Sequence, residues 1–263
     1  MKIKANGILM NYEIHGKGEN LILIHGAGGN LNMWYHQLPV FSKRYHVITY
    51  DVRGAGETES PDIGYSIPLF IEDIHELMKV VGVAKTHILG YSMGGRIAVE
   101  IAIKYPQIVK SLVLSNSILH PTRPTRESVE GWRTQLDLLD RGDIKTAAER
   151  IAGGAFSSGF VTEYPEEIEK YKNVALRNRP DGLARIMRAL VTPAPLPDLS
   201  KINCPVLLIM GTEDPNLSVE QGKKAQEEIA GSKLIILPTG HATPVELPDR
   251  FNSAVMEFLS SLK

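Results

Sequence analysis

The feature that most constrains the fold is a series of short apolar runs, separated from one another by segments with helical periodicity. The runs lie at 21–24, 46–50, 111–114, 206–210 and 233–237. Continuous apolar runs of this length are typical of strands buried on both faces of a parallel sheet. Their alternation with helical segments predicts a three-layer α/β fold with a mostly parallel sheet and right-handed crossovers.

Local signals add a hairpin and four helices to this pattern. Residues 2–14 alternate around Asn6-Gly7, a favoured two-residue turn, so we expect a β-hairpin at one edge of the sheet. Apolar spacing predicts helices over 33–43, 68–81, 219–230 and 248–262, although Pro39 interrupts the first of them.

Composition indicates a globular protein with a substantial core, because 43% of the 263 residues are apolar. The 29 basic and 30 acidic residues nearly balance, so nothing favours a nucleic-acid or membrane-surface partner. No apolar stretch is long enough to span a membrane and no leader-like segment is evident, so we expect a cytoplasmic protein. An oligomer is not indicated. The single cysteine, Cys204, is expected to be a small buried hydrophobe.

The strongest functional motif is a serine in a turn flanked by glycines. Gly-Tyr-Ser-Met-Gly at 90–94 follows a strand-like apolar pair and leads into a helical pattern that ends before Pro106. A sharp strand-to-helix turn of this kind exposes its serine above the edge of a sheet, and glycines avoid collisions within the bend. Ser92 is therefore the candidate nucleophile.

Two later loops carry groups that can activate this serine. A serine hydroxyl needs a base to accept its proton, and a carboxylate on the far side of an imidazole fixes the tautomer of that base. Among the eight histidines, His241 alone follows the last predicted strand, and Asp214 follows the strand before it. We predict a triad of Ser92, Asp214 and His241. Glu213 is the rival acid, and a turn or helix cap before Pro215 is the alternative role of Asp214.

A glycine-rich loop, His-Gly-Ala-Gly-Gly at 25–29, follows the strand 21–24. Attack on a carbonyl creates an oxyanion that needs backbone N–H donors, and this layout implies Ala27 and Met93, with Gly28 in reserve. His25 is expected to order the loop and is also a candidate substrate contact. The loop lacks G-x-G-x-x-G spacing and a P-loop Lys-Ser/Thr pair, which argues against a phosphate cradle. We expect no cofactor and no metal.

The pattern changes between about 118 and 199, where no buried strand is evident and four amphipathic stripes occur. We predict four short helices in an inserted lid at 118–199, with 1–117 and 200–263 as the core and the Pro-rich segment 192–198 as a stiff return linker. Apolar lid residues are candidate substrate contacts, with plain core packing as the alternative: Trp132, Leu136, Phe156, Phe160 and Met187. Lid arginines are candidates for binding a substrate carboxylate, with a solvated surface as the alternative: Arg126, Arg133, Arg177, Arg179, Arg185 and Arg188.

Together these segments resemble the α/β-hydrolase superfamily over nearly the whole chain. The resemblance rests on His-Gly-Ala-Gly at 25–28, Asp-Val-Arg-Gly-Ala-Gly at 51–56, Gly-Tyr-Ser-Met-Gly-Gly at 90–95, Gly-Thr-Glu-Asp at 211–214 and Gly-His at 240–241. It implies an eight-stranded sheet, a helical lid, and Ser92, Asp214 and His241 as nucleophile, acid and base.

Within the superfamily the chain is most similar to small bacterial carboxylesterases and 3-oxoadipate enol-lactonases. It departs from the family at Ala55, where Arg-Gly-His-Gly usually has a histidine. It also has Ala242 where hydrolases of carbon–carbon bonds often have tryptophan.

The hypothesis from sequence is a serine hydrolase that cleaves a small-molecule ester or lactone through an acyl-enzyme. The same triad would serve a carbon–carbon bond hydrolase, a cofactor-free perhydrolase or an acyltransferase. A ligand receptor of hydrolase ancestry and a purely structural protein are the alternatives outside catalysis.

Overall fold

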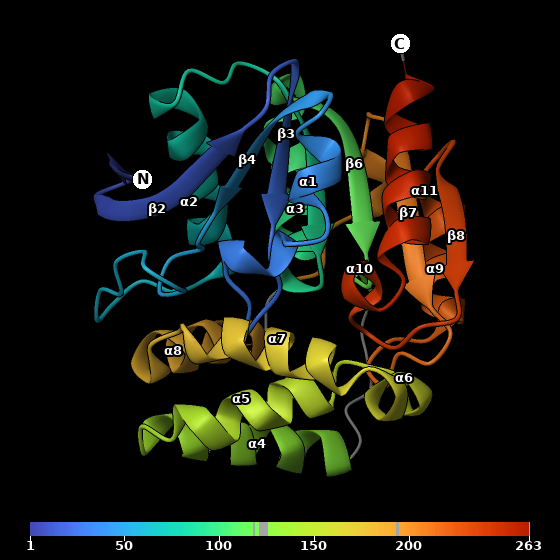
Figure 1. The fold of residues 1–263 in the computed structure, drawn as a ribbon. Coiled ribbons are helices and arrows are strands. Elements are labelled where there is room, and N and C mark those ends of the chain that lie inside the picture. Colours follow the sequence, from blue (N-terminus) through green and yellow to red (C-terminus); the bar gives the residue numbers. More distant parts are fainter. Residues whose placement is uncertain (118, 121–125, 193–194, 263) are drawn as a thin grey trace.

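The computed structural model describes residues 1–117, 119–120, 126–192 and 195–262, and in them eight strands form one sheet in the order β1-β2-β4-β3-β5-β6-β7-β8 (Figure 1). The strands are β1 Lys2–Ala5, β2 Ile8–His15, β3 Glu19–Ile24, β4 Tyr45–Tyr50, β5 Thr86–Tyr91, β6 Val109–Ser115, β7 Val206–Gly211 and β8 Lys233–Leu237. β2 is antiparallel to β1 and to β4, and all other neighbours are parallel. The predicted mostly parallel, eight-stranded sheet is confirmed.

The expected hairpin is present at the β1 edge of the sheet. Ala5 pairs with Ile8, and the two residues between them have positive φ angles, 45° at Asn6 and 79° at Gly7. A two-residue turn with both central residues in the left-handed region follows the right-handed twist of its strands, and Asn-Gly tolerates it best.

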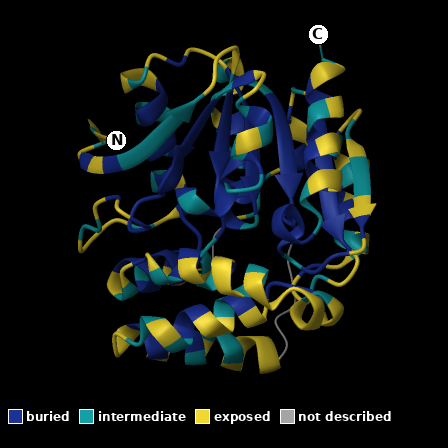
Figure 2. Ribbon diagram, viewed as in Figure 1, coloured by how far each residue is buried: buried dark blue, intermediate teal, exposed yellow. Residues whose placement is uncertain are grey.

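Alternate residues of the central strands enter two separate apolar cores, one on each face of the sheet. Ile22 and Ile24 pack in the core that includes residues of helices α2 Ile67–Val80, α3 Met93–Lys104 and α9 Val219–Glu228. Leu21 and Leu23 pack in the core that includes residues of α1 Leu38–Phe41 and α11 Pro248–Ser260. Figure 2 shows the resulting arrangement, in which a buried sheet lies between helices with exposed outer faces.

The prediction of one helix over 33–43 was wrong. This segment contains a 3-10 turn, η1 Leu31–Trp34, and the short helix α1. The side chain of Asn30 caps η1, and Pro39 lies in the first turn of α1, where its missing N–H costs no hydrogen bond. The remaining short elements are η2 Pro106–Ile108, η3 Leu199–Lys201 and α10 Thr243–Glu246, the last of which the sequence did not predict.

Five helices occur between 126 and 192, all of which is described, instead of the four expected. They are α4 Arg126–Asp140, α5 Ile144–Gly153, α6 Ser158–Glu163, α7 Pro165–Leu176 and α8 Pro180–Val191, called the cap helices below. Helix α6 is too short to give an apolar stripe. The cap helices lie across the carboxyl ends of the parallel strands (Figure 1). Residue 118 at the start of the expected lid, and 193–194 in the expected linker, lie outside the described residues.

Among the described residues, no helix has both the length and the apolar character needed to cross a membrane.

Candidate active site

The turn at Ser92 connects β5 to α3 with an unusual backbone conformation. Ser92 has φ 53° and ψ −115°, and its N–H donates to the carbonyl oxygen of Ser115 at 2.9 Å. A Cβ on Gly94 would lie 2.1 Å from the carbonyl oxygen of Ile24, and one on Gly90 would lie 2.3 Å from that of Gly94. Side chains are therefore excluded on both sides of Ser92. Contact with the neighbouring strands keeps Ser92 in a backbone conformation that non-glycine residues rarely adopt.

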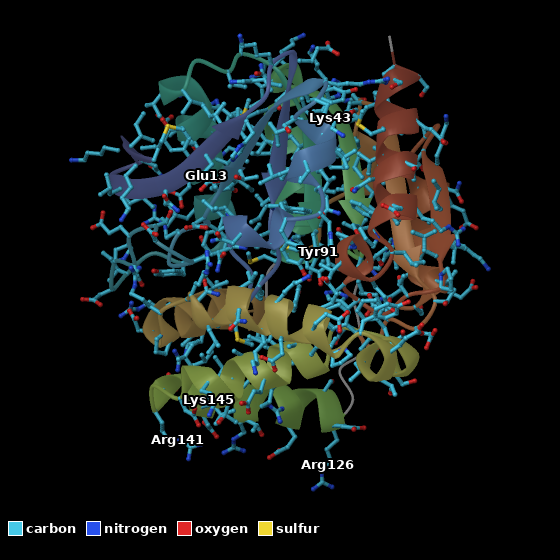
Figure 3. The ribbon with its side chains drawn as sticks, in the orientation of Figure 1. Glu13, Lys43, Tyr91, Arg126, Arg141 and Lys145 are labelled. Atoms are coloured by element: carbon cyan, nitrogen blue, oxygen red, sulfur yellow. The ribbon has the colours of Figure 1, made fainter. Side chains whose placement is uncertain are left out.

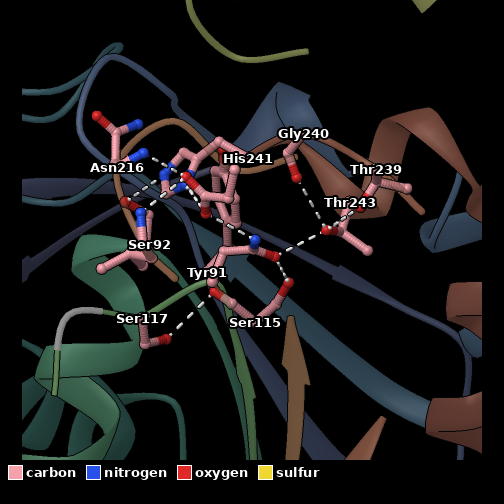
Figure 4. Close-up of polar contacts among 12 residues, drawn as sticks. Tyr91, Ser92, Ser115, Ser117, Asn216, Thr239, Gly240, His241 and Thr243 are labelled. Atoms are coloured by element: carbon pink, nitrogen blue, oxygen red, sulfur yellow. Dashed lines mark hydrogen bonds and ion pairs between the residues drawn. The ribbon is translucent and has the colours of Figure 1, made fainter. Parts of the chain in front are cut away.

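The structure brings the three predicted triad residues into one hydrogen-bonded relay, of which Figure 4 labels Ser92 and His241. His241 Nε2 lies 2.9 Å from Ser92 Oγ, and His241 Nδ1 lies 2.7 Å from Asp214 Oδ2. Because an ionised carboxylate only accepts, Nδ1 carries the proton in neutral His241 and leaves Nε2 free to accept from the hydroxyl. The Asp214 side chain is fully buried, whereas 14% of the His241 side chain is exposed.

Asp214 accepts hydrogen bonds at both carboxylate oxygens. Oδ1 accepts from the backbone N–H groups of Asn216 and Leu217 at 2.8 and 3.2 Å, while Oδ2 accepts from His241 and from Asn116 Nδ2. Burial alone would raise the pKa of Asp214, but these donors outweigh it and lower the pKa below its usual value. Asp214 thus both caps the turn that follows it and serves as the carboxylate partner of His241.

Asn116 belongs to the site although the sequence analysis did not single it out. It follows β6 with φ 46°, lies 2.8 Å from Asp214 through Nδ2, and accepts from the hydroxyl of Thr243 through Oδ1 at 2.8 Å. Two features could have indicated it. Asparagine tolerates a positive φ angle, and Asn116 directly follows β6, the strand that pairs with the strand before Asp214. Glu213, the rival acid, is exposed.

His25 is locked into the glycine-rich loop by both of its ring nitrogens. Nε2 accepts from the N–H of Val52 at 3.0 Å, so Nδ1 carries the proton and donates to the carbonyl oxygen of Gly26 at 2.8 Å. Burial lowers the pKa of His25, which keeps the ring neutral. Within the described chain, neither Ala27 nor Met93 donates its backbone N–H to another group.

Comparison with known proteins identifies the family. The family model for the α/β hydrolase fold matches residues 19–149. The 3-oxoadipate enol-lactonase 2 of Acinetobacter baylyi is 30% identical over 255 residues, which are 96% of this chain and 94% of that enzyme. The chain belongs to the α/β-hydrolase family.

Solved structures of α/β hydrolases agree with this assignment over the whole chain. The enol-lactonase from Burkholderia xenovorans has a TM-score of 0.91 at 25% identity, with 99% of this chain and 100% of that one covered. A thermophilic esterase from Thermogutta terrifontis has a TM-score of 0.90 at 26% identity, with coverages of 100% and 98%. The resemblance inferred from the sequence is confirmed, and the chain is an enzyme of the hydrolase class.

The loop that carries His241 in this α/β hydrolase is bonded to the cap helices. The buried carboxylate of Glu246 accepts from the N–H of Gly240 at 2.9 Å, and from the N–H and the hydroxyl of Ser157 at the start of α6. The N–H of Ala242 also donates to the carbonyl oxygen of Ala155 at 2.7 Å. The contacts with Ser157 and Ala155 join segments far apart in the sequence, and no local motif predicted them.

The five apolar candidates in the cap helices fall into two groups. Trp132, Leu136 and Met187 pack in a cluster made entirely of residues from α4, α5 and α8. Phe156 packs in a cluster that includes Ala242, next to His241, and its ring lies 5.2 Å from that of Phe160. The second group is therefore close to the relay, while contact of any of the five with a substrate stays a prediction.

Four of the six candidate arginines already have protein partners. Arg177 donates to Asn32, Arg179 to the carbonyl oxygen of Thr58, Arg185 to Asp62 and Asp181, and Arg188 to Asp140. Arg126 and Arg133 are exposed on α4, and Figure 3 shows Arg126 directed away from the sheet.

Neither a metal site nor a reactive thiol stands out in the described chain. No group of three or more His, Cys, Asp or Glu side chains there is arranged to hold a metal ion. Cys204 is partly buried, as expected, and burial raises the pKa of its thiol to about 11.

Proposed function

We propose that this α/β hydrolase is a serine hydrolase that cleaves a carboxylic ester or lactone through an acyl-enzyme intermediate. The observation that carries the proposal is the relay from Ser92 Oγ through His241 to the buried carboxylate of Asp214. Relatives named as enol-lactonases and an esterase support an ester or lactone as the substrate class.

In the acylation step, Ser92 Oγ attacks the carbonyl carbon while His241 Nε2 takes the hydroxyl proton. The ionised Asp214 stabilises the imidazolium and keeps Nε2 directed at the serine. When the tetrahedral intermediate collapses, the carbon–oxygen bond to the leaving group breaks and His241 returns the proton to that oxygen. In a lactone this oxygen stays attached to the acyl chain.

The developing oxyanion would be stabilised by the backbone N–H groups of Ala27 and Met93. Both groups are free of internal acceptors in the described chain. Met93 is the first residue of α3, so the positive end of the helix dipole adds to its effect. Donors that are already oriented stabilise the charge without reorganisation during the reaction.

In the deacylation step, His241 takes a proton from water, and the resulting hydroxide attacks the acyl carbon. The carbon–oxygen bond to Ser92 then breaks, the proton returns to its hydroxyl, and the carboxylic acid leaves.

Residues 118–199 would act as a lid that selects the acyl group. Ile151 of α5 lies against Gly28, since a Cβ there would be 2.9 Å from Ile151 Cδ1, and Phe156 packs beside the loop of His241. Most candidate arginines are already bound to other residues. These contacts favour an uncharged acyl group over one with a carboxylate.

The test is Ser92→Ala with p-nitrophenyl acetate as the substrate. We expect turnover to be lost while the circular dichroism spectrum and melting temperature stay close to those of the parent. Ser117→Ala, which removes a nearby serine outside the relay, is the matched control. Full activity in Ser92→Ala would contradict the proposal.

A substrate panel would then separate the related reactions that one acyl-enzyme supports. Short esters, long esters and lactones report hydrolysis, a half-ester of a dicarboxylic acid tests for a carboxylate site, and peroxide-dependent halogenation reports perhydrolysis.

A further inference from the structure

Asn178, in the connection between α7 and α8, joins the cap helices to two loops at the edge of the sheet. Its Nδ2 donates to the carbonyl oxygens of Gly28 and Ala175 at 2.8 and 3.1 Å, and its Oδ1 accepts from the N–H of Gly56 at 2.8 Å. Only 4% of the residue is exposed. Because carbonyl groups only accept and a backbone N–H only donates, these partners fix the orientation of the side-chain amide.

The contact with Gly28 connects Asn178 to the backbone N–H of Ala27 through two peptide groups. The carbonyl oxygen of Gly28 and the N–H of Gly29 are opposite ends of one planar peptide group. That N–H donates to the carbonyl oxygen of Gly26 at 3.1 Å. The Gly26 oxygen in turn shares a planar peptide group with the N–H of Ala27, so holding the oxygen fixes the direction of that N–H.

The two sides of this loop are held by different parts of the protein. On the core side, His25 Nδ1 donates to the Gly26 oxygen. On the cap side, Ile151 supplies only apolar contact with Gly28, which has φ 84°. Among the described residues, Asn178, between α7 and α8, supplies the polar contact with the peptide group after Gly28.

We propose that Asn178 is a positioning residue for the oxyanion hole. From the cap helices it orients the peptide group between Gly28 and Gly29, which through Gly26 holds the N–H of Ala27 toward the developing oxyanion. This inference rests on the proposed function, and it makes the cap helices contribute to the rate of the chemical step as well as to substrate choice.

The test compares two substitutions of Asn178 with a control substitution on α7. Asn178→Ala removes all three hydrogen bonds, whereas Asn178→Asp keeps an acceptor for Gly56 and removes the donor to Gly28. In the control, Glu167→Ala removes a cap-to-core hydrogen bond between α7 and His36, at 3.1 Å, that lies outside the loop 25–29. For each protein we would measure the melting temperature, the active-site concentration from the p-nitrophenolate burst, and kcat and KM per active site. The inhibition constant of a trifluoromethyl ketone, which forms a tetrahedral oxyanion on the serine, completes the comparison.

We expect both Asn178 variants to lose about 10- to 100-fold in kcat per active site with KM changed less than about threefold, because an oxyanion donor acts mainly on the transition state. The inhibition constant of the ketone should rise in parallel. Glu167→Ala should stay within about twofold of the parent. A lower melting temperature with unchanged kcat and ketone affinity in both Asn178 variants would overturn the inference, as would losses equal to that of the control. Activity surviving Ser92→Ala would instead overturn the proposed function.

Discussion

Asn116 donates a hydrogen bond to Asp214 at Oδ2, the same carboxylate oxygen that receives Nδ1 of His241. The two donors lie 2.8 and 2.7 Å from this oxygen, and Oδ1 is held separately by two backbone N–H groups. Asn116 therefore limits rotation of the carboxylate and helps to lower its pKa. In the proposed mechanism, Asn116 therefore helps Asp214 to orient His241.

Removing the side-chain amide of Asn116 should reduce the hydrogen-bond support of the Asp214 carboxylate without straining the backbone. Asn116 has a positive φ angle, so Asn116→Gly deletes the side chain and still fits the turn. We expect a fall in kcat of about tenfold, in line with the loss of one hydrogen bond to a charged group. Steady-state hydrolysis of p-nitrophenyl acetate measures it, with Asn252→Ala, a buried asparagine bonded to Gln37 and to the carbonyl oxygen of His36, as the control. Equal activities of the two variants would show that the contact does not matter.

Asp214 and its rival Glu213 can be separated by paired amide substitutions. Asp214→Asn removes the charge and places either an amide donor or a neutral acceptor beside Nδ1, so His241 loses its fixed tautomer. We expect kcat at neutral pH to fall by about 10³- to 10⁴-fold, the scale seen when a triad acid is neutralised. Glu213→Gln changes an exposed side chain and should leave kcat within about twofold of the parent. A large loss in Glu213→Gln with none in Asp214→Asn would reassign the acid.

Elements and site residues with a local signal could be predicted from the sequence. Buried strands could be predicted because they are continuous apolar runs. The residues after Met210 and Leu237 include Asp214 and His241, the predicted acid and base, which the structure joins to Ser92 by hydrogen bonds. Short elements were missed because α6 and α10 contain too few residues to show a period.

Long-range polar contacts could not be predicted in the same way. Asn178 bonds to Gly28, 150 positions away, and Glu246 bonds to Ser157, 89 positions away. No periodic pattern or motif in the sequence indicates either contact, because both form only when the cap helices pack against the sheet.

Glu246 offers a second test of how the cap helices support the active site. Its carboxylate accepts from Gly240 and twice from Ser157, so Glu246→Gln would turn an amide N–H₂ toward groups that also donate. We expect about 1–3 kcal/mol less free energy of unfolding and a lower kcat, because the loop of His241 loses its anchor. Urea denaturation and steady-state kinetics measure the two effects. Glu227→Gln, on the exposed side of α9, is the control, and a Glu246→Gln protein as stable and active as that control would contradict the assignment.

His25 should make the stability of the enzyme depend on pH. Burial lowers its pKa in the folded state, against opposing effects of the Gly26 carbonyl and Asp51, so the unfolded chain binds a proton more readily. The free energy of unfolding is therefore fully retained above the unfolded pKa of about 6.5 and falls below it, by at most about 1.4 kcal/mol per pH unit for one proton. Urea titrations above and below this pH should give a smaller loss on acidification for His25→Gln than for the parent. His15→Gln, on β2, should keep the full loss, and identical losses in all three proteins would exclude His25 as the source.

Gly94, in the first turn of α3, and Gly131, within α4, should respond in opposite ways to alanine. At Gly94 the new Cβ would lie 2.1 Å from the carbonyl oxygen of Ile24, so the turn at Ser92 has to move away from β3. We expect Gly94→Ala to lose activity and at least about 3 kcal/mol of stability, or to accumulate in the insoluble fraction. At Gly131 the nearest atom is 4.0 Å away, on the flexible end of Arg150, so Gly131→Ala should gain about 0.5–1 kcal/mol from its helix propensity and keep full activity. Thermal denaturation and p-nitrophenyl acetate turnover compare the two variants. An active and stable Gly94→Ala protein would contradict the prediction, because it would show that the turn at Ser92 tolerates a side chain at this position.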